Sequence, residues 1–337
     1  MKKIAIVGGG VIGMSVASKL AHSAQVTIFD PTPGGGASHG NSRIFRQGHD
    51  HPCLVDLSRR ANFLWREWEK ETGRELMHRG GLITLGQAAS ARRDLLADAE
   101  ITHRWHNVGK IHSIGLGFDS ALWEPAAGVI WSEKVIFELR DSLDKTNVEM
   151  VPEHVFEVGE NNGRGRVWAR SGPRDFDRVV MLAGPGLFDI LYDWSYHEGM
   201  IGLSEGLRLE FPVQPGLRPV ESFIDRDAGI YGLPCPGFRR YAVGASGDSF
   251  ENLQSKIVSY VNLRLAHLDP EPEKTSVCTA VDIGGEGDTW ALLDQGPLLA
   301  FAGGNLFKWA PLLGEELASL ALSGEADPRF IEACSDR

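Results

Sequence analysis

The chain has 337 residues, of which 42% are hydrophobic and 23% are charged, which is enough apolar content for two domains or one large domain with a sizeable core. The net charge of −11 argues against nucleic acid or an anionic membrane as the main partner. No apolar run approaches the roughly 18 residues that a membrane-spanning helix needs.

The sulfur and imidazole side chains give no sign of a metal centre. The four cysteines are far apart, with no C-x-x-C pair and no metal-ligand spacing, so thiols in a reducing cytoplasm are the simplest interpretation. His49 and His51 lack a neighbouring acid or cysteine cluster, and we interpret them as loop residues. The opening MKKIAIV imitates a signal peptide, but glycines interrupt it at once.

The first thirty residues predict a strand, a glycine turn, a helix and a second strand. Lys3–Val7 is a short apolar run of the buried parallel type, and Val26–Phe29 is the second strand. Between them, Gly8, Gly10 and Gly13 form GxGxxG. The first glycine permits a tight turn, the second lets the backbone approach a pyrophosphate, and the third lets the helix pack closely on the strand.

Two further features favour a dinucleotide site over an ordinary glycine turn. The helix expected over Val11–Ala21 directs its first amides toward the phosphate, and Asp30 ends the second strand, where an acid can accept hydrogen bonds from a ribose. Much later, Val179–Leu182 runs into Ala183-Gly184-Pro185-Gly186. That pattern is typical either of a cofactor-contacting strand in flavoproteins or of one more parallel strand.

The segment GGGASHGNSRIFRQGHDH (34–51) has almost no apolar residues and includes Arg43 and Arg46. It is either a solvated loop or a backbone that approaches an anion, and in a helical turn the two arginines would lie on neighbouring parts of one face. The next segment, 57–73, predicts a charged helix with Phe63, Leu64 and Trp68 on one core-facing side.

The remaining elements are mostly strands. We expect strands at 81–86, near Val155, and at 206–213, 228–234, 239–246 and 276–281, because β-branched and aromatic residues alternate there between turn residues. A helix is expected from about Pro311 to Leu322.

Several of these motifs together resemble a known family. GGGVIG with Asp30, SHGNSRIFR, GGLITLG, LAGPG, KTSVC and GGNLFKWAPLLGEELASLALSG are similar to the D-amino-acid-oxidase superfamily of FAD enzymes, within the monomeric sarcosine oxidase and N-methyltryptophan oxidase branch. The match is poor from about 204 to 268. The resemblance implies a mixed α/β fold: a Rossmann-like FAD-binding domain (1–80, 134–200 and 285–337) interleaved with a substrate domain on a mixed β-sheet (81–133 and 201–284).

The resemblance also assigns cofactor contacts. It implies FAD bound covalently through Cys278, although Ala280 and Asp282 depart from the family's pattern, and a small buried apolar side chain is the alternative. The other expected FAD contacts are Gly8, Gly10, Val11, Ile12, Gly13, Asp30, Pro31, His39, Ser42, Arg43, Val155 (near adenine), Ala183, Gly184, Gly303, Gly304, Asn305, Phe307 and Lys308.

Four residues receive substrate or acceptor roles from the resemblance. Arg46 and Lys308 would bind a substrate carboxylate, a task that suits the planar guanidinium; the alternative for Lys308 is a lysine that snorkels at a helix start. Tyr231 lies in the strand that the family directs toward its substrate, or simply packs in a sheet. The family's oxygen-activating lysine falls on Ala242. Either Arg240, two residues away on the same strand face, substitutes for that lysine, or the protein reoxidises slowly and uses another acceptor.

The expected function is FAD-dependent oxidation of the C–N bond of a small amino acid or N-alkylated amino acid. The imine would be hydrolysed and oxygen would take the electrons, giving hydrogen peroxide. The alternative is a dehydrogenase or modifying flavoprotein that uses another acceptor or a larger partner. The expected partners are therefore a carboxylate-bearing amine and oxygen, with no nucleic acid and no membrane.

Overall fold

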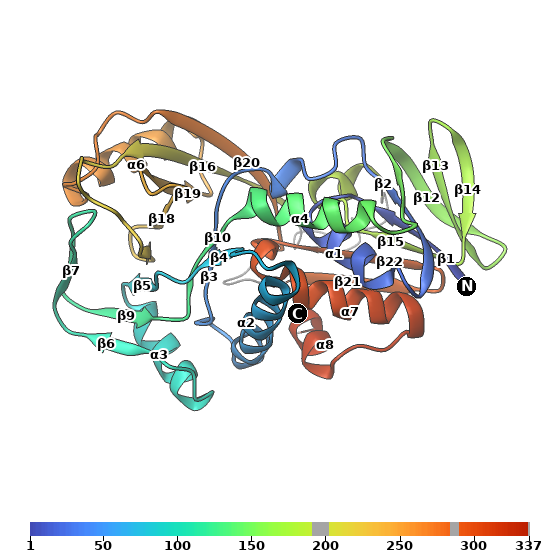
Figure 1. The fold of residues 1–337 in the computed structure, drawn as a ribbon, viewed down its shortest axis with the longest axis horizontal. Coiled ribbons are helices and arrows are strands. Elements are labelled where there is room, and N and C mark those ends of the chain that lie inside the picture. The colour runs from blue at the N-terminus through green and yellow to red at the C-terminus, as the bar shows by residue number, and fades with distance from the viewer. Residues whose placement is uncertain (191–201, 284–289, 336–337) are drawn as a thin grey trace. The chain divides into compact units, whose positions relative to one another are not determined.

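The computed structural model describes residues 1–190, 202–283 and 290–335. The chain divides into two compact units: unit 1 comprises Met1–His39, Val135–Leu203 and Ala280–Arg337, and unit 2 comprises Gly40–Lys134 and Ser204–Thr279 (Figure 1). The predicted mixed α/β class is confirmed. The expected domain boundaries at 200/201 and 284/285 lie outside the described residues, and residues 40–80, expected in the FAD-binding domain, group with unit 2.

Unit 1 is built on a six-stranded sheet with the order β11-β2-β1-β15-β22-β21. β11, β2, β1, β15 and β22 run parallel, and β21 is an antiparallel edge strand. The bounds are β1 Lys2–Val7, β2 Ala24–Phe29, β11 Glu149–Val151, β15 Arg178–Met181, β21 Trp290–Gln295 and β22 Leu298–Gly303.

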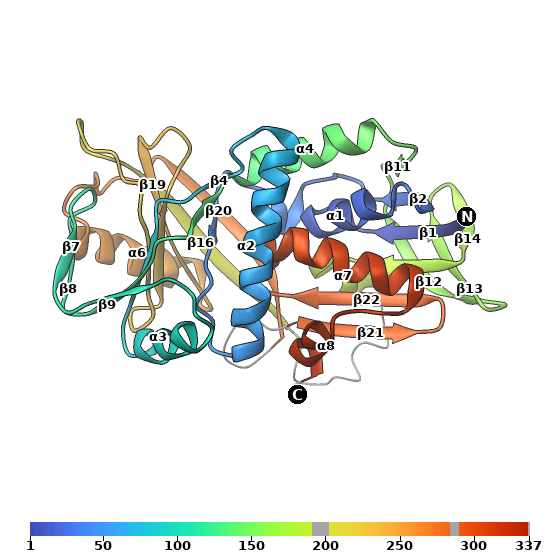
Figure 2. The same ribbon diagram turned by 60° about the horizontal axis from the view of Figure 1, so that its bottom comes forward.

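Two helices from opposite ends of the sequence pack side by side on this sheet. They are α1 (Val11–Leu20) and α7 (Ala310–Ser323), both visible in Figure 2. A Cβ added to Gly314 would lie 3.0 Å from Ser15 Cβ, so the glycine permits the close approach. Helices from the first and last parts of the sequence thus form one layer of unit 1.

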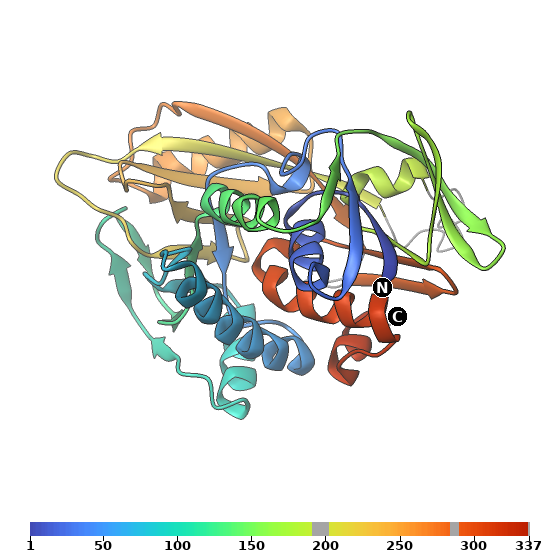
Figure 3. The ribbon, with the colours of Figure 1, turned by 45° about the vertical axis from the view of Figure 1, so that its right-hand side comes forward.

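A small antiparallel sheet completes the core of unit 1. It comprises β12 (Val155–Asn161), β13 (Arg164–Ala169) and β14 (Gly172–Phe176), seen beside the main sheet in Figure 3. Val155, Val167 and Phe176 pack with residues of β1, β15 and β22 in one cluster. The other elements of unit 1 are α4 (Ser132–Asp144, which begins in unit 2), α5 (Leu187–Ile190) and α8 (Pro328–Ser335).

Unit 2 is built on an eight-stranded mixed sheet with the order β20-β16-β19-β18-β17-β5-β9-β6. β17 and β5 pair in parallel, whereas β16–β19, β19–β18, β18–β17, β5–β9 and β9–β6 are antiparallel. The bounds are β5 Leu82–Leu85, β6 Arg104–His106, β9 Ala121–Glu124, β16 Gly202–Pro212, β17 Ser222–Asp225, β18 Ile230–Pro234, β19 Arg240–Ser246 and β20 Lys274–Asp282.

The two faces of this sheet differ in chemistry. In antiparallel pairs, directly opposite residues share a face; Tyr231 faces Gly244, Gly244 faces Arg208, and Ala242 faces Glu210. These residues therefore lie on one polar-bearing face. The other face packs against α6 (Phe250–Arg264) through Leu207, Leu209, Phe211, Phe223, Val243 and Ile257.

The helix α2 (Pro52–Thr72) begins one turn earlier than the sequence pattern suggested. His51 caps it by accepting from Cys53 N, and the helix buries Leu54, Leu57, Ser58, Ala61 and Trp65 among others. The expected apolar side formed by Phe63, Leu64 and Trp68 was wrong, because Phe63 is 60% exposed. The helix begins at Pro52, and its buried side includes Trp65 instead.

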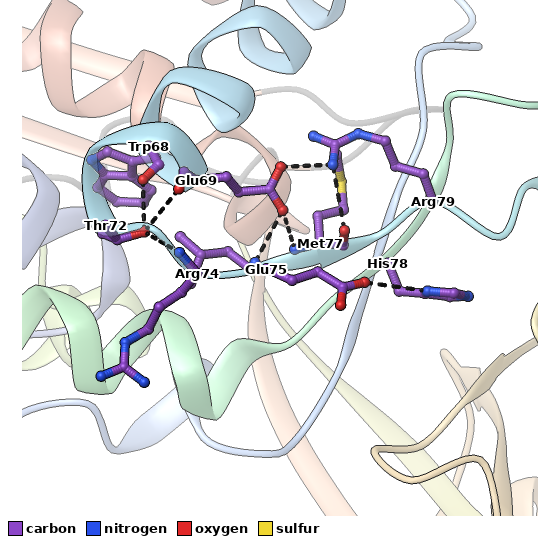
Figure 4. A network of polar contacts seen from close by, with 9 residues as sticks. Trp68, Glu69, Thr72, Arg74, Glu75, Met77, His78 and Arg79 are labelled. Carbon is purple, nitrogen blue, oxygen red and sulfur yellow. Dashed lines mark hydrogen bonds and ion pairs between the residues drawn. The ribbon is translucent and has the colours of Figure 1, made fainter.

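The C-terminal end of α2 is tied to a three-stranded sheet of β3 (Arg43–Phe45), β10 (Gly128–Ile130) and β4 (Met77–His78). Glu69 accepts from the backbone N–H groups of Leu76 and Met77 at 3.0 and 2.8 Å, and from Arg79 Nη1 at 2.6 Å (Figure 4). One carboxylate thus fixes the return of the chain from helix to strand. Unit 2 also contains α3 (Ala88–Asp98) and the hairpin β7 (Gly109–Ile111)–β8 (Leu116–Phe118).

None of the helices in the described ranges is long and apolar enough to span a lipid bilayer.

Candidate active site

The three glycines of the first turn have different tasks in the structure. Gly8 has φ +108°, and a Cβ there would lie 2.5 Å from the Leu182 carbonyl oxygen. A Cβ on Gly13 would lie 1.9 Å from the Gly8 oxygen. Gly10, by contrast, has extended backbone angles, and its Cβ would meet only Ser38 Oγ, at 3.1 Å, in the described part of the chain. The fold requires Gly8 and Gly13, whereas Gly10 keeps the approach to the helix N-terminus clear.

The acid at the end of β2 is held rigidly against this turn. Asp30 accepts from Gly9 N at 2.5 Å and from Thr32 N at 2.7 Å. Val11 N donates to Ser38 Oγ at 3.0 Å, and the exposed Pro31 follows directly. Since each carboxylate oxygen can accept more than one hydrogen bond, Asp30 keeps acceptor capacity for a ribose hydroxyl.

The other expected cofactor residues of unit 1 share an edge with this turn. Ala183 and Gly184 follow β15, and Gly303 and Gly304 lie at the end of β22. Because β1, β2, β15 and β22 are parallel, their carboxyl ends meet at one edge, which is where open α/β sheets bind nucleotides. The Ala183 Cα lies 2.7 Å from the Cβ position of Gly8, so the two turns are in contact. These residues fit a dinucleotide.

The segment after β22 holds a buried lysine. Asn305 adopts φ +53°, and the short helix Leu306–Trp309 follows, with Phe307 buried. Lys308 is 5% exposed, donates to Asn305 O at 3.1 Å, and has its Nζ 5.8 Å from the centroid of the Trp309 ring. A snorkelling lysine keeps its ammonium group in water, so that alternative does not describe Lys308.

In unit 2, Arg208 grips the segment that precedes β3. Its Nη1 donates to Ser42 O at 2.7 Å, and its Nη2 donates to Asn41 Oδ1 at 2.9 Å and to Ser42 Oγ at 2.6 Å. Asn41 in turn donates to Glu210 at 3.1 Å. Ser42, expected to contact the flavin, is fully buried, so its position is set by a strand far away in the sequence. His39 is exposed and ends unit 1.

Three side chains influence the pKa of Arg43: Arg208, Cys278 and Tyr231. Burial lowers the pKa of the Arg43 guanidinium, and the charge of Arg208 lowers it further, against the opposing influence of Cys278 and Tyr231. Arginine nevertheless stays protonated. One further cation, a thiol and a phenol therefore lie around Arg43 within unit 2.

The close approach of Tyr231 to Gly244 places the tyrosine. A Cβ on Gly244 would lie 2.4 Å from both Cζ and Oη of Tyr231. The half-buried phenol thus lies over β19 because the facing residue has no side chain. Cys278, on β20, is also half-buried, so it is not the fully buried apolar side chain of the alternative interpretation.

The surroundings of Ala242 and Arg240 bear on the expected reaction with oxygen. Ala242 is 0% exposed and belongs to an apolar cluster with Val129, Trp131, Leu233 and Cys235. Arg240 Nη1 lies 3.4 Å from Glu210 Oε2, and Lys274 Nζ lies 3.9 Å from Glu210 Oε1. Glu210 thus compensates the charge of Arg240, whereas the described residues place no carboxylate within 4 Å of Arg208.

Arg46 lies just beyond β3, which ends at Phe45, and is 7% exposed. The expectation that a helical turn brings Arg43 and Arg46 onto one face was wrong, because Arg43–Phe45 is a strand. Four residues of these surroundings were not predicted from the sequence: Arg208, Glu210, Asp50 and Arg92. For Arg208 and Glu210 a signal existed: both stand on the polar side of the alternation in GLRLEFP.

A glycine turn at the carboxyl edge of a parallel sheet, joined to a second unit with a mixed sheet, defines a two-domain dinucleotide-dependent enzyme. The family model described as FAD dependent oxidoreductase matches residues 3–320. The chain therefore belongs to this family of FAD-dependent oxidoreductases, and FAD is its cofactor.

Individual relatives and structures agree with that family. Monomeric sarcosine oxidase from Bacillus sp. (strain NS-129) is 24% identical over 383 residues, covering 96% of this chain and 94% of the relative. The enzyme of the same name from Bacillus sp. (strain B-0618) is 26% identical over 258 residues, and this alignment covers 70% of the chain and 61% of that relative.

Among solved structures, NikD matches with a TM-score of 0.83 and 19% identity, covering 98% of this chain and 97% of NikD. NikD is described as an unusual amino acid oxidase essential for nikkomycin biosynthesis. L-proline dehydrogenase from P.horikoshii matches with a TM-score of 0.82 and 16% identity, covering 98% and 95%. At these identities the two structures show the fold.

Proposed function

We propose that the protein oxidises the C–N bond of a small amino acid or N-alkylated amino acid, with Arg46 binding the substrate carboxylate. The observation that supports this best is that Arg46 is 7% exposed, at the end of the motif resembling the family's flavin-contacting loop. The sarcosine oxidase relatives favour the same substrate class. The proposal also assigns a carboxylate-binding role to Lys308.

The residues that would hold FAD are those of the sheet edge in unit 1, with Ser42, Arg43 and Cys278 proposed for the flavin. Backbone amides at the start of α1 would face the pyrophosphate and Asp30 the ribose. When bound, FAD supplies the two-electron acceptor for the amine and passes the electrons to oxygen, giving hydrogen peroxide.

The chain's own residues mainly bind and orient. A buried arginine holds a carboxylate bidentately in a fixed direction, which presents the neighbouring C–N bond in one orientation and reduces the entropy lost in the reaction. The phenol of Tyr231, fixed over Gly244, is proposed to line the substrate side of the sheet. Hydrolysis of the released imine needs only water.

The test uses acetate as a carboxylate probe and the flavin absorption spectrum as the readout. Arg46→Ala and Lys308→Ala should each weaken acetate binding at least about tenfold, because a hydrogen bond to a charged group contributes about 1.5–3 kcal/mol. Arg59→Ala is the control, since that side chain is 55% exposed on α2. Unchanged acetate affinity in Arg46→Ala would show that the carboxylate binds elsewhere.

A second candidate is a dehydrogenase that passes electrons to an acceptor other than oxygen. The observation that favours it is the environment of residue 242: Ala242 lies in an apolar cluster, and Glu210 compensates Arg240. The cation that β19 offers to a developing superoxide is thus already paired with a carboxylate. The measurement is the amount of hydrogen peroxide formed per amine consumed, compared with reduction of a soluble quinone. Equal amounts of peroxide and product support the oxidase, and turnover only with quinone supports the dehydrogenase.

A further inference from the structure

The segment between β3 and α2 is irregular and yet buried. Arg46 is 7% exposed, Gln47 4% and His49 1%. Irregular backbone normally lies at the surface, because its N–H and C=O groups need partners. Whatever supplies those partners here also fixes the backbone that carries Arg46.

One anchor of the segment is a buried carboxylate on β9. Glu124 is 2% exposed, and its Oε2 accepts from Gln47 N at 2.8 Å and from Gly48 N at 2.7 Å. Ser58 Oγ donates to Gln47 O at 3.1 Å. A Cβ on Gly48 would lie 2.8 Å from Glu124 Oε1, so the glycine allows the carboxylate to reach the backbone.

The other anchor is an ion pair with α3, in which the arginine is buried and the carboxylate stays partly exposed. The side chain of Arg92 is 0% exposed, and its Nε and Nη2 donate to the two carboxylate oxygens of Asp50 at 2.6 and 2.7 Å. Arg226 Nη2 lies 3.5 Å from the same carboxylate. Within the described residues, Arg92 Nη1 is buried without a hydrogen-bond partner.

Stability alone does not account for this pair. Desolvating the Arg92 guanidinium is expensive, so the pair contributes less net stability than its short distances suggest. The buried donor of Arg92 adds a further cost. A positioning role explains why a costly pair stands four residues from Arg46 in the chain.

The charges of the segment act on one another. Burial lowers the pKa of Arg92 and the charge of Arg46 lowers it further, whereas Asp50 opposes both. Burial alone would raise the pKa of Asp50, but Arg92, Arg226 and Arg46 together hold it below its usual value. Three guanidinium groups thus act on the carboxylate of Asp50, whereas Glu124 accepts hydrogen bonds from the backbone of the same segment.

We propose that Arg92, acting through Asp50, is a positioning residue for Arg46. The bidentate pair fixes the irregular segment so that the Arg46 guanidinium is already oriented when a carboxylate arrives. Asp50 also occupies the fork of Arg92, which directs the anion to Arg46 rather than to Arg92. This inference rests on the proposed function, in which Arg46 binds the substrate carboxylate.

The decisive variant replaces the pair by apolar side chains, Arg92→Met with Asp50→Leu, in the FAD-loaded protein. Its urea unfolding midpoint should stay at or above that of the wild type, while the acetate Kd, followed by flavin absorption, should rise about tenfold because the guanidinium is no longer oriented in advance. Acetamide, which has the shape of acetate without its charge, should bind the variant and the wild type equally.

The matched control is Arg166→Met with Asp175→Leu, which removes a bidentate pair of 2.6 and 2.8 Å in unit 1 and should leave acetate binding unchanged. An acetate Kd within twofold of the wild type in the folded Arg92→Met/Asp50→Leu variant overturns the inference. Should that variant not fold, Arg92→Lys decides, because it keeps the charge and loses the fork: weaker acetate binding supports the inference, and wild-type binding overturns it.

Arg46→Ala separates this inference from the function on which it rests. If Arg46→Ala binds acetate as the wild type does, the proposed function fails and the positioning role fails with it. If Arg46→Ala loses acetate binding while the Arg92 variants retain it, only the positioning role fails.

Discussion

Gly10 offers the cleanest test of the cofactor site at the level of one residue. Its backbone is extended and its Cβ would meet only Ser38 Oγ in the described chain, so valine is compatible with the fold but occupies the space for the pyrophosphate. We expect Gly10→Val to fold with a near wild-type unfolding midpoint and to lose FAD, measured by absorption after gel filtration.

Gly13→Ala is the contrasting control. The added methyl group would lie 1.9 Å from the Gly8 oxygen, so this variant should lose stability as well as FAD. Full flavin content in Gly10→Val would contradict the pyrophosphate assignment.

Cys278 decides whether the flavin is attached covalently. The thiol is half-buried and lies in the electrostatic surroundings of Arg43. If the bond forms, denatured wild-type protein keeps flavin fluorescence on a gel, and Cys278→Ser releases it. Cys235→Ser is the control, because burial raises the pKa of the Cys235 thiol to about 11 and a buried neutral thiol is a poor nucleophile. Flavin that leaves the denatured wild type would end the covalent interpretation.

At the scale of elements, Arg208 connects β16 to the segment before β3. Arg208→Met should lower the free energy of unfolding by about 2–3 kcal/mol, because it leaves buried acceptors of Asn41 and Ser42 unsatisfied. Urea unfolding measures this, with Arg93→Met as a control at a side chain that is 39% exposed. Equal midpoints for the two variants would show that the three hydrogen bonds contribute little.

Elements formed by local patterns were predictable from the sequence. β1, α1, β2, β18, β19 and α7 appear close to where periodicity and glycine spacing indicated them. The errors share a cause: interactions between distant residues determined the outcome. Arg43 is in a strand because it pairs with β10, and Asp50 is fixed by Arg92, 42 residues away. The residues around Asp50 in the sequence (GHDH) give no indication that Arg92 is its partner.

At the scale of the whole molecule, Asp50 makes a contribution to acid stability. The pKa of this carboxyl is lowered on folding, so its contribution is present above the unfolded pKa of about 3.9 and is lost as the pH falls through the lower folded value. Asp50→Asn should therefore be less stable than the wild type at pH 7, and the difference should shrink below about pH 4. Urea midpoints at several pH values measure it; a difference that stays constant with pH would contradict this assignment.

The side-by-side packing of α1 and α7 also bears on how the protein is made. The turn at Gly8 and the helix α1 leave the ribosome early, whereas β22 and α7, which complete their sheet and helical layer, come from the last part of the chain. Domains fold as units, so the edge proposed to hold the nucleotide is complete only once β22 and α7 have joined β1 and α1. We expect a fragment that ends before β22 to lose FAD binding.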